Sequence, residues 1–217
     1  MESRAGGRGT KPDAARLAVA EIAPLPVRQG AVPGRLLGWL TGSILHVAGW
    51  HIEGRLPDIP RYVAIGAPHT STWDLPIFLL AGASLSDGFT TVKIAWLGKH
   101  TAFNGPVGAL FRKLGGIPVN RDAGHHVIKT VIQALRASPR IALAIAPEGT
   151  RQKVEYWKPG FYYIARLAKV PIVCGFLDYK RKVVGVGLVI YPTSDIEADM
   201  QQIREFYSQV TARHPER

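Results

Sequence analysis

Short apolar runs alternate with amphipathic stretches from residue 61 to the end of the chain. The runs are rich in β-branched and small apolar residues and are bounded by turn residues, which is typical of buried strands. The stretches between them carry apolar residues three and four positions apart, which is typical of helices. This alternation predicts an α/β fold, a single domain with a mixed, mainly parallel sheet flanked by helices. The predicted strands are 62–66, 92–97, 117–119, 141–146, 172–177 and 183–190, and the predicted helices are 73–83, 106–114, one around 127–135, 160–168 and one that begins at Asp195.

The first part of the chain has a different pattern. Residues 1–34 are rich in Arg, Ala, Gly and Pro without periodicity, which predicts a flexible basic arm. The run 36–52 has no acidic residue, lysine or arginine, but its 17 residues are at the short limit for a span of roughly 20. We predict that residues 35–54 form an apolar, membrane-associating interfacial helix with Trp39 and Trp50 at the lipid headgroups. A helix packed on the protein's own core explains this run nearly as well.

Composition narrows the classes of partner. Lysine and arginine exceed aspartate and glutamate by 27 − 16 = 11, so the surface favours an anionic partner such as a membrane surface, a phosphorylated substrate or an acidic carrier protein. The sequence has no signature of a nucleic-acid-binding module, and no nucleic acid is expected. Cysteine and histidine are too sparse and scattered for a zinc site, and we predict no metal and no cofactor. The single cysteine, Cys174, lies in an apolar run and is predicted to be a buried hydrophobic residue.

A histidine and an aspartate five positions apart follow the first predicted strand. The first block, residues 69–74, begins with His69 and ends with Asp74. A histidine acts as a general base when a carboxylate bonded to its second ring nitrogen fixes the tautomer and stabilises the imidazolium. The pair is therefore a candidate catalytic dyad. The alternative is a surface histidine beside an aspartate that caps a helix.

Two further groups of polar residues follow predicted strands. Arg121 comes after a short strand flanked by glycines, and its guanidinium can hold a phosphate or carboxylate. The turn after the most apolar run carries Glu148, Gly149, Thr150 and Arg151. Glu148 can accept a hydrogen bond from Arg121 or from a substrate hydroxyl, and Gly149 can leave backbone amides accessible. Thr150 and Arg151 can both donate to phosphate oxygens. An ordinary surface turn is the alternative. Because ligands bind at the carboxyl ends of strands in open α/β sheets, we expect the turn at residues 147–151 to share one crevice with the dyad.

Four sequence blocks follow one another along the chain: His-x-x-x-x-Asp at 69–74, Gly-Ile-Pro-Val-Asn-Arg at 116–121, Pro-Glu-Gly-Thr-Arg at 147–151 and Val-Pro-Ile-Val at 170–173. In this order they resemble the four blocks of the glycerolipid acyltransferase family, whose best-known members are the lysophosphatidate (1-acylglycerol-3-phosphate) O-acyltransferases. The resemblance covers more than half of the chain, from about residue 62 to residue 179, and makes residues 55–217 the expected acyltransferase domain.

The resemblance implies a role for each block. His69 deprotonates the acceptor hydroxyl, which attacks an acyl thioester, and Asp74 orients the histidine. Arg121 holds the phosphate of the acceptor, and Glu148, Gly149 and Arg151 of the third block complete that pocket. The fourth block shapes the cleft for the acyl chain or the acceptor. Ser71 lies in the first block, but the strained Gly-x-Ser-x-Gly turn of a serine nucleophile is absent, so no covalent acyl-enzyme is expected.

The resulting expectation is an acyltransferase that uses acyl-CoA or acyl-carrier protein as co-substrate and a lysophospholipid-like acceptor. It would act at an anionic membrane surface, on the cytoplasmic face, either peripheral or shallowly embedded. Thr70, Trp73 and Ala146 depart from common family residues close to the reacting groups, and these departures concern the acceptor rather than the reaction type. A non-catalytic lipid- or carrier-binding protein and a thioester hydrolase remain as alternatives.

Overall fold

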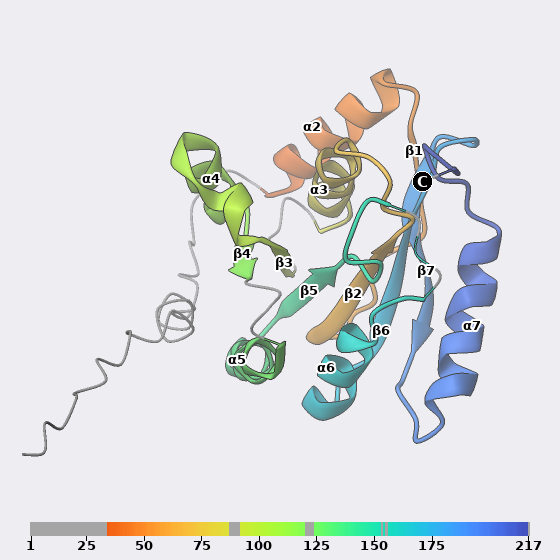
Figure 1. Ribbon diagram of the computed structural model, residues 1–217. Coiled ribbons are helices and arrows are strands. Elements are labelled where there is room, and N and C mark those ends of the chain that lie inside the picture. Colours follow the sequence, from red (N-terminus) through yellow and green to blue (C-terminus); the bar gives the residue numbers. More distant parts are fainter. Residues whose placement is uncertain (1–33, 87–91, 120–123, 153, 155, 217) are drawn as a thin grey trace, which may run out of the picture.

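The computed structural model describes residues 34–86, 92–119, 124–152, 154 and 156–216. A seven-stranded sheet in the order β1-β7-β6-β2-β5-β3-β4 forms its centre (Figure 1). Every neighbouring pair is parallel except β6 and β7. The predicted mixed, mainly parallel α/β domain is therefore confirmed. The strands are β1 (His51–Glu53), β2 (Arg61–Ala67), β3 (Lys93–Lys99), β4 (Gly116–Val119), β5 (Ile141–Ile145), β6 (Ile172–Asp178) and β7 (Val183–Ile190).

Helices cover both faces of the sheet (Figure 1). Successive residues of β2 point to opposite faces of the sheet, so both faces need a cover. Val63 and Ile65 join the core under α5, α6 and α7, whereas Gly66 faces Phe78 of α3 on the other side. Strands buried on both faces read as continuous apolar runs, as the sequence does here. The helices are α2 (Gly34–Val47), α3 (Asp74–Leu85), η1 (His100–Phe103), α4 (Gly105–Lys113), α5 (Gly124–Ala137), α6 (Gly160–Ala168) and α7 (Ile196–Ser208).

The predicted strands and helices occur with boundary shifts of a few residues. Strand β4 lies at the sheet edge, as expected for a strand whose Pro118 has no N–H to donate. Helix α7 begins after Asp195, whose Oδ1 accepts from the backbone N–H of Ala198 at 3.0 Å. Near its other end, the Tyr207 hydroxyl lies 2.8 Å from the carbonyl oxygen of Gly175 on β6. Cys174 is fully buried in the main core, which confirms the prediction of a buried hydrophobic residue, and this burial raises the pKa of its thiol to about 12.

The structure corrects the prediction for residues 35–54. Helix α2 ends at Val47, and residues 51–53 form β1, which pairs with β7. Trp50 consequently lies in the core beside Leu45 and Ile77, 8% exposed, and not at a lipid surface. Trp39 is 66% exposed. Among the described helices, none is both long and apolar enough to cross a membrane.

Candidate active site

The site residues follow three parallel strands and lie at the carboxyl ends of these strands. Strand β2 lies between β5 and β6 and runs parallel to both, so the segments that follow these three strands are neighbours. His69 follows β2, Glu148 follows β5, and Tyr179 follows β6. This is the carboxyl end of the parallel strands, where ligands bind in such folds. The expected convergence of the first and third blocks is therefore found.

His69 and Asp74 form the pair that their spacing suggested. The Nδ1 atom of His69 is 3.1 Å from Oδ2 of Asp74, within hydrogen-bond distance. Asp74 is the first residue of α3 and is fully buried, whereas the side chain of His69 is 26% exposed. With Nδ1–H bonded to the carboxylate, the Nε2 lone pair is available to accept a proton. The alternative of a surface histidine beside a simple capping residue does not fit a buried carboxylate of this kind.

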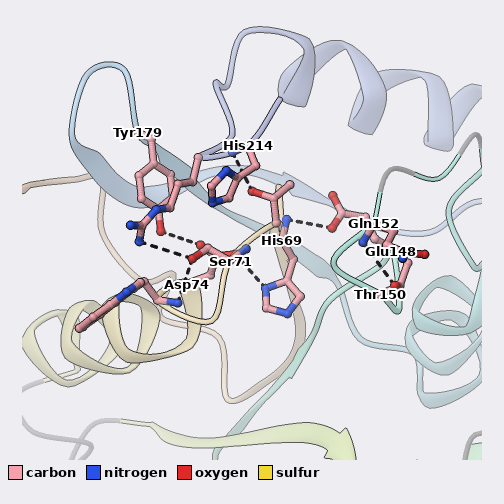
Figure 2. A network of polar contacts seen from close by, with 11 residues as sticks. His69, Ser71, Asp74, Glu148, Thr150, Gln152, Tyr179 and His214 are labelled. Atoms are coloured by element: carbon pink, nitrogen blue, oxygen red, sulfur yellow. Dashed lines mark hydrogen bonds and ion pairs between the residues drawn. The ribbon is translucent and has the colours of Figure 1, made fainter. Parts of the chain in front are cut away.

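The carboxylate of Asp74 accepts two further hydrogen bonds. The hydroxyl of Tyr179 donates to Oδ1 at 2.6 Å, and the backbone N–H of Ser71 donates to Oδ2 at 2.8 Å (Figure 2). Burial alone would raise the pKa of Asp74, but the bonds from His69, Tyr179 and Ser71 outweigh it and leave that pKa below its ordinary value. Asp74 is thus held as a carboxylate that fixes the ring of His69.

Glu148 supports the other side of His69. Its Oε2 accepts from the backbone N–H of His69 at 2.8 Å, and Figure 2 shows the carboxyl on the side of His69 away from Asp74. Burial raises the pKa of Glu148, although the bond from His69 partly opposes this. Glu148 was predicted to bind Arg121 or a substrate hydroxyl, and this stays a prediction, because Arg121 lies outside the described residues. In the structure, the carboxyl of Glu148 joins the third block to the first.

The other residues of the third block shape the turn. Gly149 has a φ of +65°, a conformation that glycine adopts without strain, and the carbon of any side chain there would lie 3.2 Å from Lys158. The hydroxyl of Thr150 accepts from the backbone N–H of Gln152 at 3.3 Å. Arg151 lines a hollow beside the first block. Arg121 lies outside the described residues.

Sequence reasoning missed Tyr179, whose ring is packed from two directions. It meets Trp50 edge-on with ring centroids 5.0 Å apart, and the guanidinium of Arg213 lies 5.8 Å from its centroid on another side. A signal was available, because Tyr179 directly follows a strand predicted in the same parallel sheet. We infer that Tyr179 is a positioning residue that acts on His69 through Asp74.

The removal of the Tyr179 hydroxyl tests this role. A hydrogen bond to a charged group contributes about 1.5–3 kcal/mol, so Tyr179→Phe should lower kcat roughly 10- to 100-fold, with KM nearly unchanged. Tyr191→Phe removes a hydroxyl from a tyrosine that is 66% exposed and serves as the matched control. Steady-state kinetics of both variants checks the prediction, and equal kcat values would assign Tyr179 a purely structural role.

A buried carboxylate within hydrogen-bond distance of a histidine, at the carboxyl ends of parallel strands, is an arrangement that could remove a proton from a substrate. Residues 51–175, more than half of the chain, match the family model named Acyltransferase. The chain belongs to the Acyltransferase family, and the enzyme is an acyltransferase.

A solved structure shares the fold. The crystal structure of the 1-acyl-sn-glycerophosphate (LPA) acyltransferase PlsC from Thermotoga maritima aligns with a TM-score of 0.58 at 16% sequence identity. The alignment covers 80% of this chain and 76% of that one. No curated protein matches the chain by sequence.

Proposed function

We propose that the enzyme transfers a fatty acyl group from acyl-CoA or acyl-carrier protein to the hydroxyl of a lysophospholipid-like acceptor. The observation that carries this proposal is the 3.1 Å contact between His69 Nδ1 and the buried Asp74 carboxylate, which leaves Nε2 of His69 available as a base. Family membership supplies the reaction type. The activity named for the structural neighbour motivates the choice of a phosphorylated, monoacylated acceptor.

The reaction balances with one base and no covalent enzyme intermediate. Nε2 of His69 takes the proton of the acceptor hydroxyl while the oxygen attacks the thioester carbonyl. The imidazolium so formed is stabilised by Asp74. Collapse of the tetrahedral intermediate breaks the carbon–sulfur bond, and the thiolate leaves with the proton held by His69. The products are an ester and a free thiol, and the histidine returns to its neutral form.

Purified enzyme given an isotope-labelled acyl thioester and a panel of acceptors tests the proposal. Lipid mass spectrometry should find the label in an ester of a lysophospholipid or of glycerol phosphate. Label found only as free fatty acid would make the protein a thioester hydrolase. Lipid binding without consumption of the thioester, with every acceptor, would make it a non-catalytic binding protein.

Helix α2 supports action at a membrane. Its small or buried residues, Gly38, Thr41 and Leu45, lie on the inner side of the helix, which packs against α3. The other side exposes a continuous apolar surface next to the basic residue Arg35. An amphipathic helix of this kind binds in the headgroup region of an anionic bilayer. We therefore expect a peripheral or shallowly embedded enzyme on the cytoplasmic face, where its thioester donors are found. The exposed apolar residues of α2 are Leu36, Leu37, Trp39, Leu40, Ile44 and Val47.

A charge placed in that surface should weaken membrane binding. Ile44→Asp removes an apolar side chain that is 54% exposed. It also adds a negative charge to the helix, which an anionic bilayer repels. We expect roughly tenfold weaker sedimentation with phosphatidylglycerol-containing vesicles. Leu167→Asp, at a residue that is 55% exposed on α6, is the matched control and should bind normally. Equal losses in both variants would count against α2 as the membrane contact.

A further inference from the structure

We propose that the segment after α7, residues 209–216, contributes Arg213 as a further cationic residue to the phosphate-binding site expected for Arg151, in a hollow lined by the loop that joins His69 to Asp74. The proposal rests on the proposed function only for the identity of the ligand that carries the phosphate. The subsite is a hollow of about 290 Å³. Its lining consists of Thr70, Ser71, Thr72, Trp73, Arg151, Arg213 and His214.

Hydrogen bonds hold the segment against the dyad. The carbonyl oxygen of Thr211 accepts from the backbone N–H of Tyr179 at 2.9 Å. Three residues later, the backbone N–H of His214 donates to the hydroxyl of Thr70 at 3.2 Å. Figure 2 shows His214 next to the loop that carries His69. The segment is therefore attached both to the end of β6 and to the loop between the two members of the dyad.

Arg213 lies between these two attachments. Its guanidinium stacks near the ring of Tyr179, and its Nη1 is 3.5 Å from Oγ of Ser71. The hydroxyl of Ser71 also accepts from the backbone N–H of Trp73 at 3.2 Å. These contacts occupy only part of a group with five N–H donors. Arg213 also interacts with the hydroxyl of Tyr179, and donors beyond these contacts remain for a ligand in the hollow that Arg213 lines.

The charge in the hollow favours an anion. Among the described residues, neither Arg151 nor Arg213 forms an ion pair with a carboxylate, whereas Arg140, Arg181 and Arg204 each do. At the rim, His214 lies 3.4 Å from Glu216. Arg151 and Arg213 both carry a permanent positive charge, so the hollow that they line attracts an anion. Phosphate matches their planar forks of donors, and each can bind it through two oxygens.

The size and position of the hollow suit a phosphorylated head group. Its volume is at the lower end of the roughly 300–1,000 Å³ of small-molecule sites, so it accommodates a head group and not a whole lipid. The loop that lines it begins at His69 and ends at Asp74. A phosphate held there would keep an adjoining hydroxyl or thioester close to the base, which is how positioning contributes to rate. Either the acceptor's phosphate or a phosphate of CoA has the required chemistry.

Calorimetric binding of glycerol 3-phosphate and, separately, of CoA to the full chain tests the subsite without requiring turnover. Arg213→Gln should raise the Kd of one of these ligands about tenfold or more, because a charge-assisted hydrogen bond is lost. Arg213→Lys should recover part of the affinity. Arg204→Gln, on an exposed face of α7, removes the same charge elsewhere and should leave both Kd values unchanged. Thermal melting of each variant checks that the fold is retained.

The ligand affected identifies the source of the phosphate. Weaker binding of glycerol 3-phosphate alone assigns the subsite to the acceptor, and weaker binding of CoA alone assigns it to the donor. Either result supports the subsite. If the protein binds one of these ligands through Arg213 but forms no ester, the proposed reaction fails and the subsite stands. Unchanged affinity for both ligands in Arg213→Gln, with intact wild-type binding, would overturn it. In turnover, the same variant should raise the KM of the identified substrate.

Discussion

His69→Ala should abolish nearly all acyl transfer while the protein remains folded. Removal of a general base typically costs roughly 10²–10⁴-fold in rate, and we expect kcat to fall within this range. The side chain of His69 is partly exposed and makes no contribution to the apolar core, so its loss leaves packing unchanged. Initial rates of ester formation at saturating donor and acceptor measure the effect.

The control for this variant is His46→Ala. His46 lies exposed near the end of α2, and its removal should leave kcat unchanged. Both proteins should melt like the wild type, and His69→Ala should also bind vesicles like the wild type. A His69→Ala enzyme with wild-type turnover would show that another group removes the proton.

Asp74→Asn should impair both catalysis and stability. An amide offers one acceptor oxygen, so it cannot accept from His69, Tyr179 and Ser71 together, and its NH₂ group would favour the wrong tautomer of His69. We expect kcat to fall about 10²-fold or more. Donors left unpaired in a buried site cost about 1–3 kcal/mol each, so the free energy of unfolding should decrease by a similar amount.

The pH dependence of this stability difference has a defined sign. The folded-state pKa of Asp74 lies below its ordinary value of 3.8. The stabilisation by the carboxylate is therefore complete above pH 3.8 and is lost as the pH falls through the folded-state pKa. Denaturant unfolding should show a large gap between wild type and Asp74→Asn at pH 7 that narrows below pH 3.8. A gap that stays constant with pH would mean that the charge of Asp74 does not stabilise the fold.

Local sequence patterns were sufficient for most of the fold. Apolar runs in parallel strands are buried on both faces, so strands such as β5 are recognisable without knowledge of their partners. Strand β1 was not recognisable in this way. It has three residues, and its partner β7 lies more than 120 positions later in the chain. The sequence did contain a local signal for the end of α2, because glycine is common just beyond the end of a helix. Gly49 lies two residues after Val47 and has a φ of +78°.

The site divides in a similar manner. His69 and Asp74 lie in one loop, and a spacing of five residues is visible in the sequence. Glu148 was found as a site residue, but its bond to the backbone of His69 depends on the pairing of β2 with β5, which no single segment encodes. Arg213 had no signal at all. It follows the last helix, and only the folded chain brings it to the first block.

Thr70 illustrates how a contact changes the interpretation of a residue. Its departure from the common family residue suggested an effect on the acceptor. In the structure Thr70 is buried, and its hydroxyl accepts from the backbone N–H of His214. Any influence of Thr70 on the acceptor therefore passes through the segment that carries Arg213. Trp73 is 59% exposed and lines the same hollow, where it can contact a ligand directly.

The central claim is that His69, oriented by Asp74, removes the proton from the hydroxyl of a lipid acceptor, whose oxygen attacks an acyl thioester. The most direct test incubates equal amounts of wild type and His69→Ala with labelled acyl thioester and the acceptor panel, and compares the labelled products by mass spectrometry. We predict labelled ester from the wild type and almost none from the variant, with the unused thioester recovered. Labelled ester from both proteins at equal rates, or only free fatty acid from the wild type, would contradict the account.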